Sequence, residues 1–161
     1  MKRRSVLSGL AAGFALAACG STAQSGGAKT GGTATATPTP SAKATQATVE
    51  RFAGKARSGF YDNLIFHRVE DWVVQGGDPL GTGTGGEKVP SEYNDLSFKL
   101  GAVGIARGPD PAINNGSQFF VVKRDSTFLD KQYTNFGNVT AGMDVVQGIK
   151  IGDKIKSITV E

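Results

Sequence analysis

The chain has very few of the side chains from which metal sites, disulfides and thiol chemistry are built. Its 161 residues include one cysteine, Cys19, and one histidine, His67. A disulfide within the chain needs two cysteines, and a zinc site needs several Cys or His ligands at close spacing. Asp110, Asp125 and Asp130 are too scattered to predict a calcium or magnesium cage. We therefore expect no cofactor and no metal, and a fold that is stabilised by packing alone.

A hydrophobic run long enough to cross a membrane is also missing. Lys2, Arg3 and Arg4 precede an uncharged, Leu- and Ala-rich stretch over residues 5–18, which is shorter than the ~20 apolar residues of a spanning helix. The stretch ends in small residues before Cys19, a pattern that resembles the cleavage site of bacterial lipoproteins. We expect residues 1–18 to be a signal peptide, and Cys19 to carry a lipid that anchors an extracytoplasmic protein to a bacterial membrane.

Outside this leader the chain has no strong excess of one charge. The formal net charge is +4, and loss of the three leader cations lowers it by three, to +1. The basic pI therefore belongs mostly to the leader. A nucleic-acid partner is not favoured, because such proteins carry a basic surface on the folded domain itself.

Large apolar side chains are missing from the segment that follows the leader. Gly, Ser, Thr, Ala and Pro dominate residues 19–45, and such a composition cannot bury enough surface to offset the entropy of ordering. We expect a flexible tether there. The remaining residues, 46–161, are enough for one domain with a proper core.

Within this domain the sequence pattern predicts short strands and two helices. Val49, Phe52, Ala53 and Ala56 recur at helix spacing, and Gly59 is a natural stop after them. Runs bounded by Gly, Pro, Asn and Asp predict strands over residues 64–69, 72–75, 101–106, 118–122 and 155–160, and a second helix is expected over residues 143–149. Many short strands with few helices favour a barrel or a sandwich.

Four motif blocks follow one another in this domain. They are Phe66-His67-Arg68, Gln75-Gly76-Gly77-Asp78-Pro79, Gly116-Ser117-Gln118-Phe119-Phe120, and Leu129 to Tyr133 before Phe136-Gly137. In this order and spacing, the sequence from about Ala47 to Glu161 resembles the cyclophilin family of peptidyl-prolyl isomerases. The resemblance implies a mainly β fold, an antiparallel barrel of about eight strands or somewhat fewer, capped by two α-helices. It also implies an isomerase of proline-containing unfolded or partly folded polypeptides, which we expect to be exported ones, and we expect a monomer.

Arg68 is the catalytic residue that the resemblance implies. Rotation about an X-Pro bond is slow because resonance stiffens the C–N bond, with a barrier of ~20 kcal/mol. Catalysis needs no nucleophile, metal or cofactor, only an apolar slot for the proline ring and a donor that favours the twisted amide. An arginine is always charged and offers several N–H groups, and by resemblance Arg68 points at the prolyl amide.

The resemblance also implies the residues that bind the substrate. They are Trp72, Val73, Phe120 and Leu129 in the slot, Phe128 and Tyr133 at its rim, Gln75 and Gln118 as polar contacts, and Ala106 and Arg107 along the peptide. Considered without the resemblance, the apolar members are better explained as core residues than as walls of a binding slot.

Several positions depart from the common family pattern. The stretch from Arg68 to Gln75 is one residue shorter, and Trp72-Val73 replaces the usual Phe-Met. Phe128 stands where many members have a tryptophan that is associated with cyclosporin binding. Arg107 takes a position that is often asparagine, so the preferred substrate is expected to differ.

The front of the domain leaves two structural alternatives and a second function open. Family members have two strands before the first helix, where this chain has tether-like sequence. Residues 33–37 alternate Thr and Ala as a weak strand would. Either a degenerate strand remains there or the barrel is incomplete, with an unpaired edge. An altered domain of this kind is also compatible with a proline-peptide binding or chaperone module that has little or no isomerase activity.

Two further motifs have simpler explanations than catalysis. His67 adjoins Arg68, but bond rotation moves no proton, so we expect a hydrogen-bonded structural histidine. Residues 81–86 match a dinucleotide-binding glycine pattern, but the sequence Glu87 to Pro90 follows them instead of an apolar helix. This segment therefore predicts a flexible loop beside the peptide groove.

Overall fold

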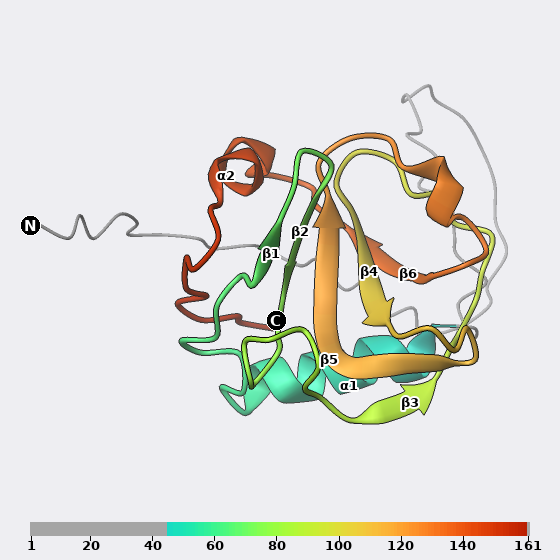
Figure 1. Ribbon diagram of the computed structural model, residues 1–161, viewed down its shortest axis with the longest axis horizontal. Coiled ribbons are helices and arrows are strands. Elements are labelled where there is room, and N and C mark those ends of the chain that lie inside the picture. The colour runs from blue at the N-terminus through green and yellow to red at the C-terminus, as the bar shows by residue number, and fades with distance from the viewer. Residues whose placement is uncertain (1–44, 161) are drawn as a thin grey trace, which may run out of the picture.

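Six strands form one antiparallel sheet in the computed structural model, which describes residues 45–160 (Figure 1). The strands are β1 Arg68–Val69, β2 Val73–Gly76, β3 Lys88–Pro90, β4 Ala102–Arg107, β5 Ile113–Val122 and β6 Thr134–Asn138. Their order is β1-β2-β5-β4-β6, and β3 pairs with the first half of β5. The helices are α1 Gln46–Arg57, α2 Met143–Gly148 and the 3-10 turn η1 Thr127–Leu129. The mainly β, antiparallel fold with two α-helices is confirmed, and among the described residues the sheet is not closed.

The first helix forms where the apolar spacing predicts it. Phe52, Ala53 and Ala56 are buried, and Gly59 follows with φ of +70°, a conformation that glycine adopts without strain. Thr48 is buried as well, because its backbone N–H and its hydroxyl both donate to the Glu92 carboxylate. This contact joins the start of α1 to a loop more than forty residues away, which the helical pattern did not reveal.

β5 is the central strand, and its alternating side chains separate two cores. Phe119 and Val121 face one cluster, which also contains Phe52 of α1. Phe120 and Val122 face the opposite cluster, as expected for successive residues of a strand. Figure 1 shows α1 passing behind the lower end of β5.

The closing strand predicted over residues 155–160 is wrong. Only an isolated bridge joins Lys154 to Ile65, and backbone hydrogen bonds link the neighbouring residues 152–155 to residues 63–66. Because the residues before Arg68 pair with this segment and not with the sheet, β1 is shorter than the predicted 64–69. Residues 155–160 continue without strand structure, although Ile155 is buried.

β3 and β6 were not predicted as strands. β6 is rich in Asn, Thr and Gly, and two of its polar residues, Thr134 and Asn135, are buried. They are paired there: the Thr134 hydroxyl accepts from Asn114 and from the backbone of Glu92. Such partners allow polar residues to be buried at low cost. The buried side of this strand is therefore polar, and a search for apolar alternation could not identify it.

Several predictions concern residues that the structure does not describe. The signal peptide, Cys19, the tether up to residue 44 and the alternating residues 33–37 all lie outside residues 45–160. Over the described range, no helix combines the length and the apolar character that crossing a bilayer requires.

Candidate active site

A pocket of about 370 Å³ opens on the face of the sheet that carries Phe120. It is lined by His67, Arg68, Trp72, Val73, Gln75, Thr82, Gly83, Ala106, Arg107, Phe120, Leu129 and Tyr133. Every site residue predicted within the domain lines this pocket except Gln118 and Phe128. Side chains that are separated by more than sixty positions in the sequence therefore meet around one pocket, whose volume is in the range of small-ligand sites.

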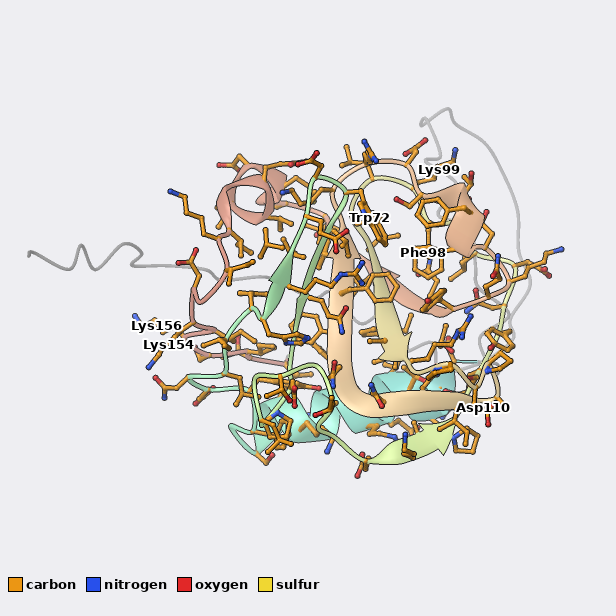
Figure 2. The ribbon with its side chains drawn as sticks, viewed as in Figure 1. Trp72, Phe98, Lys99, Asp110, Lys154 and Lys156 are labelled. Atoms are coloured by element: carbon orange, nitrogen blue, oxygen red, sulfur yellow. The ribbon has the colours of Figure 1, made fainter. Side chains whose placement is uncertain are left out.

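The floor of the pocket is apolar and belongs to the protein core. Val73, Phe120 and Leu129 are all less than 5% exposed. The Phe120 ring stacks on Phe98 at 5.6 Å and meets Tyr133 edge-on at 5.7 Å, geometries that aromatic rings favour. Figure 2 shows Trp72 at the top of the sheet and Phe98 beside it. The same side chains can therefore be part of the core and form the floor of a slot for a proline ring.

Gly104 of β4 allows the Phe120 ring to occupy this position. A Cβ atom at residue 104 would overlap the Phe120 ring and would lie 2.8 Å from Phe98 Cε1. Both rings are packed on several sides, so neither can easily move away. The small residue in a buried strand therefore serves the shape of the pocket.

Arg68 lies at the mouth of the pocket and is half-exposed. Its Nε donates to Glu70 Oε1 at 2.6 Å, and its Nη1 lies 3.5 Å from Gln75 Oε1. The guanidinium is 5.3 Å from the centre of the Trp72 ring. Trp72 Nε1 donates to the second oxygen of Glu70 at 2.8 Å. Glu70 therefore holds both Arg68 and Trp72, and the hydrogen bond from Arg68 keeps the pKa of Glu70 below its usual value.

Gln75 is held from behind by Gln118, which explains why Gln118 does not line the pocket. Gln75 Nε2 donates to Gln118 Oε1 at 2.9 Å, and Gln118 Nε2 donates to the Gly85 carbonyl at 2.7 Å. Gln118 is fully buried. Gln118 therefore orients Gln75 and exposes no surface to the pocket.

Phe128 extends the rim without entering the pocket. Its side chain is 60% exposed and contacts the Trp72 ring at 5.3 Å between centroids. Its neighbour Leu129 points inward, because η1 places successive residues on different sides. The rim position that the sequence implies for Phe128 therefore agrees with the geometry.

Three lining residues, His67, Thr82 and Gly83, were missed. The expectation of a hydrogen-bonded His67 is wrong, because neither ring nitrogen has a hydrogen-bond partner among the described residues. Burial lowers the pKa of His67, and the nearby Asp78 only partly opposes this shift. The neutral ring therefore borders the pocket as a mostly apolar wall. The sequence could have indicated Thr82 and Gly83 as lining residues, because residues 81–86 were predicted to form a loop beside the peptide groove.

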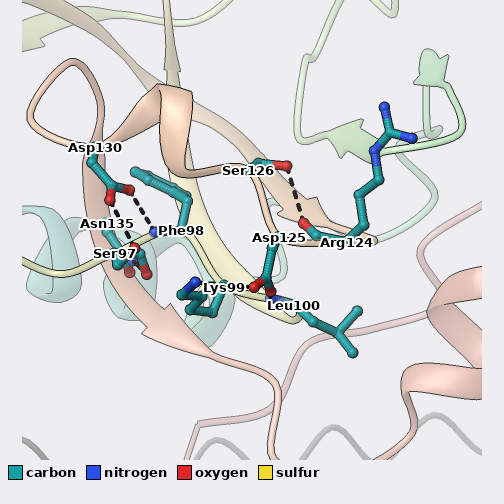
Figure 3. Close-up of polar contacts among 9 residues, drawn as sticks. All are labelled: Ser97, Phe98, Lys99, Leu100, Arg124, Asp125, Ser126, Asp130 and Asn135. Carbon is teal, nitrogen blue, oxygen red and sulfur yellow. Dashed lines mark hydrogen bonds and ion pairs between the residues drawn. The ribbon is translucent and has the colours of Figure 1, made fainter.

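The segment that supplies Leu129 is held by two aspartates, shown in Figure 3. Asp130 accepts hydrogen bonds from the Ser97 hydroxyl and from the Phe98 backbone, each at 2.7 Å. Asp125 accepts from the Leu100 backbone and from Lys99. These carboxylates therefore cap backbone N–H groups of the facing loop, and they fix η1 beneath the pocket.

Comparisons with known proteins agree with this geometry. Residues 41–160 match the family model described as cyclophilin type peptidyl-prolyl cis-trans isomerase/CLD. Peptidyl-prolyl cis-trans isomerase B of Bacillus subtilis is 41% identical over 125 residues, covering 74% of this chain and 85% of that protein. Peptidyl-prolyl cis-trans isomerase CYP71 of Arabidopsis thaliana is 42% identical over 121 residues, 68% of this chain.

The chain matches only part of some relatives. It spans 18% of the length of the Arabidopsis protein. Among solved structures, a Cryptosporidium parvum cyclophilin type peptidyl-prolyl cis-trans isomerase, crystallised in the presence of the dipeptide Ala-Pro, superposes with a TM-score of 0.67. It is 27% identical, and the match covers 76% of this chain and 90% of that one.

Proposed function

The chain belongs to the cyclophilin-type peptidyl-prolyl cis-trans isomerase family, and on this premise we propose that it is an enzyme that accelerates rotation about X-Pro peptide bonds. The uncatalysed rotation takes tens of seconds because its barrier is ~20 kcal/mol. An acceleration of 10⁵-fold would require about 7 kcal/mol of stabilisation that is realised in the transition state and not in the planar amide.

The observation that carries the proposal is the position of Arg68 over an apolar floor. Val73, Phe120 and Leu129 give the proline ring a buried surface, and the guanidinium lies at the mouth of the same pocket. When the amide twists, its nitrogen lone pair is no longer shared with the carbonyl and becomes a hydrogen-bond acceptor. A charged N–H donor at that atom favours the twisted state over the planar one.

The rest of the pocket positions the peptide chain around the proline. Gln75, held by Gln118, offers its amide to the substrate backbone. Trp72 and Tyr133 also line the pocket and add aromatic surface to its walls. The rotation breaks no bond and transfers no proton, so the neutral His67 has no acid–base task in it.

We place the substrates outside the cytoplasm. The support is the leader sequence and Cys19, which indicate a bacterial lipoprotein, together with the absence of any sequence that favours a nucleic-acid partner. Unfolded or partly folded exported chains with trans or cis prolines are the substrates that such a location offers. The Cryptosporidium relative, crystallised in the presence of the dipeptide Ala-Pro, supports a proline-containing ligand.

The test is the cis–trans exchange rate of a short X-Pro peptide with the full chain, with Arg68→Ala and with the control Arg57→Ala. Arg57 is an exposed cation at the end of α1, which packs against the other core cluster. We expect Arg68→Ala to lower the catalysed rate by about 10²-fold or more, and Arg57→Ala to leave it unchanged. A protein that binds the peptide in a titration but leaves its exchange rate at the uncatalysed value would instead be the binding module.

A further inference from the structure

Arg107 is a cation on the pocket wall whose charge no carboxylate of the described residues neutralises. Five ion pairs are formed over residues 45–160, and none includes Arg107. Arg68, the other arginine of the pocket, is paired with Glu70 at 2.6 Å. The two cations of the site therefore differ: one is already matched by an anion and the other is not.

The backbone directs Arg107 toward the pocket. Alternation along β4 places Ala102 and Ala106 on the pocket side of the sheet. The pairing of β4 with β5 shifts register between Ile105 and Arg107, and such irregularities re-aim the next side chain. Ala106 and Arg107, although consecutive, therefore both line the pocket.

The guanidinium of Arg107 is held in one orientation before any substrate arrives. It lies 4.5 Å from the centre of the Tyr133 ring. Its Nε donates to the Gln132 carbonyl at 2.8 Å, and its Nη1 donates to the Gly108 carbonyl at 3.1 Å. The Nη2 group has no acceptor among the described residues. A fixed guanidinium with unused N–H donors is well suited to bind a carboxylate.

No carboxylate competes for this position from the pocket wall. The lining residues include no Asp or Glu. The nearby Asp78 carboxylate is buried and accepts backbone hydrogen bonds from Leu80, Thr82 and Gly83, and the Asp110 carboxylate accepts from the Ala112 backbone. The Arg107 guanidinium therefore has no counter-charge from the described residues and is open to a carboxylate of a bound chain.

We propose that Arg107 makes the enzyme selective for prolines that have an acidic residue nearby in the substrate chain. This proposal rests on the proposed function of the pocket and names its preferred substrate class. The apolar floor binds the proline ring, and the carboxylate of a residue within two positions of that proline pairs with the Arg107 guanidinium. Peptides with a basic residue at the same position are disfavoured by charge repulsion.

The experiment measures isomerisation of a peptide series by the full chain. Glu, Gln or Lys is placed in turn at each of the two positions before and the two positions after one proline. At one or more positions we expect Glu to be turned over about two- to fivefold faster than Gln, the range for a partly exposed ion pair, and Lys to be slower than Gln. The preference should shrink from low salt to ~1 M salt, where screening acts within ~3 Å.

Variants identify the residue that is responsible. Arg107→Gln should remove the preference for Glu, Arg107→Lys should keep part of it, and Arg107→Glu should reverse it toward Lys. The matched control Arg57→Gln removes the same charge from α1 and should keep the preference. Circular dichroism of each variant verifies that it is folded, and the conservative Arg107→Lys variant tests the proposal even if Arg107→Glu does not fold.

Failure of this proposal is distinct from failure of the enzyme assignment. Equal rates for Glu and Gln peptides at all four positions, or a preference that persists in Arg107→Gln, would overturn the role of Arg107 while leaving the isomerase intact. If no peptide is isomerised, titration of the same peptides decides: tighter binding of Glu than of Gln peptides, lost in Arg107→Gln, supports the acidic preference, and equal affinities overturn it.

Discussion

Glu70 contacts two functional groups of the pocket at once. One carboxylate oxygen accepts from Arg68 and the other accepts from the Trp72 indole. An arginine side chain has many rotamers, and fixing it before the substrate binds reduces the entropy that the transition state would otherwise lose. At the scale of single residues, Glu70 therefore positions the proposed donor, without contact to the reacting amide.

We predict that Glu70→Ala lowers kcat/KM by about two- to fivefold, because an exposed ion pair of this kind contributes modestly. This drop in kcat/KM should occur without loss of stability, since exposed substitutions usually change the free energy of unfolding by about 0.5 kcal/mol or less. Steady-state kinetics and thermal unfolding test both parts, with Glu50→Ala on α1 as the control. Unchanged or increased activity in Glu70→Ala would show that Arg68 does not need this partner.

The pH dependence of this contact has a defined sign. The hydrogen bond from Arg68 lowers the pKa of Glu70 below its ordinary value of 4.5. The carboxylate therefore remains ionised until the pH falls below that value, and its contribution to activity is lost only there. The Glu70→Ala variant should lack this acidic loss, so the ratio of wild-type to variant activity should fall toward one as the pH drops below 4.5.

At the scale of elements, the loop from Asp78 to Gly85 forms one wall of the pocket around a single carboxylate. Asp78 is 1% exposed and accepts from the backbone N–H groups of Leu80, Thr82 and Gly83. The glycine-rich segment is therefore tied down, where the sequence alone predicted flexibility. Thr82 and Gly83 are thereby held at the pocket.

Asp78 also predicts how stability depends on pH. Burial alone would raise the pKa of Asp78, but the backbone hydrogen bonds outweigh burial and leave the pKa below its ordinary value of 3.8. When the folded-state pKa is the lower one, the stabilisation is complete above the unfolded-state value and is lost as the pH falls below it through the folded-state value. We therefore expect Asp78→Asn to lower the free energy of unfolding at pH 7 by about 1.5–3 kcal/mol.

The measurement is urea unfolding from pH 7 to pH 3, with Asp71→Asn as the control. Asp71 is exposed and forms no hydrogen bond or ion pair with the other residues of the range 45–160. Wild type should lose stability below about pH 4, while Asp78→Asn should lose less over the same interval because the titrating group is gone. Parallel pH profiles for the two proteins would contradict this assignment of the loop's stability to Asp78.

At the scale of the whole molecule, the ends of the sheet are covered by segments that are not strands. Beyond β6, Asn94 Nδ2 donates to the Asn135 carbonyl and Asn135 Nδ2 donates to the Ser97 carbonyl. Next to β1, residues 152–155 bind the backbone of residues 63–66. One backbone carbonyl of β6 and the backbone just before β1 are thus hydrogen-bonded to neighbouring segments, and these groups are not free to pair with another sheet edge.

The anchoring of the molecule is predicted from Cys19. We expect the full chain, expressed in a bacterium, to partition into the detergent phase and to incorporate labelled fatty acid, and Cys19→Ser to lose both properties. The control Ser21→Ala should behave like wild type. A Cys19→Ser protein that stays in the membrane fraction would mean that the leader, and not a lipid, holds the chain there.

The sequence by itself determined the features that depend on neighbours in the chain. The spacing of Phe52, Ala53 and Ala56 identified α1, and the apolar run over residues 118–122 identified the second half of β5. The order of the motif blocks identified the family and nine of the twelve residues that line the pocket. The spacing within α1 and the apolar run of β5 are local signals that one helix or strand is enough to produce. The motif blocks identify the family because they occur together in one order along the chain.

Only the tertiary structure decided which of these residues touch and which cations remain unpaired. Glu70 lies two residues from both Arg68 and Trp72, and the turn between β1 and β2 brings both side chains to its carboxylate. Arg107 faces the pocket because of a register shift between two strands, and His67 loses its hydrogen-bond partners to burial. Such outcomes depend on contacts between distant segments and on the exclusion of water, which no periodic pattern encodes.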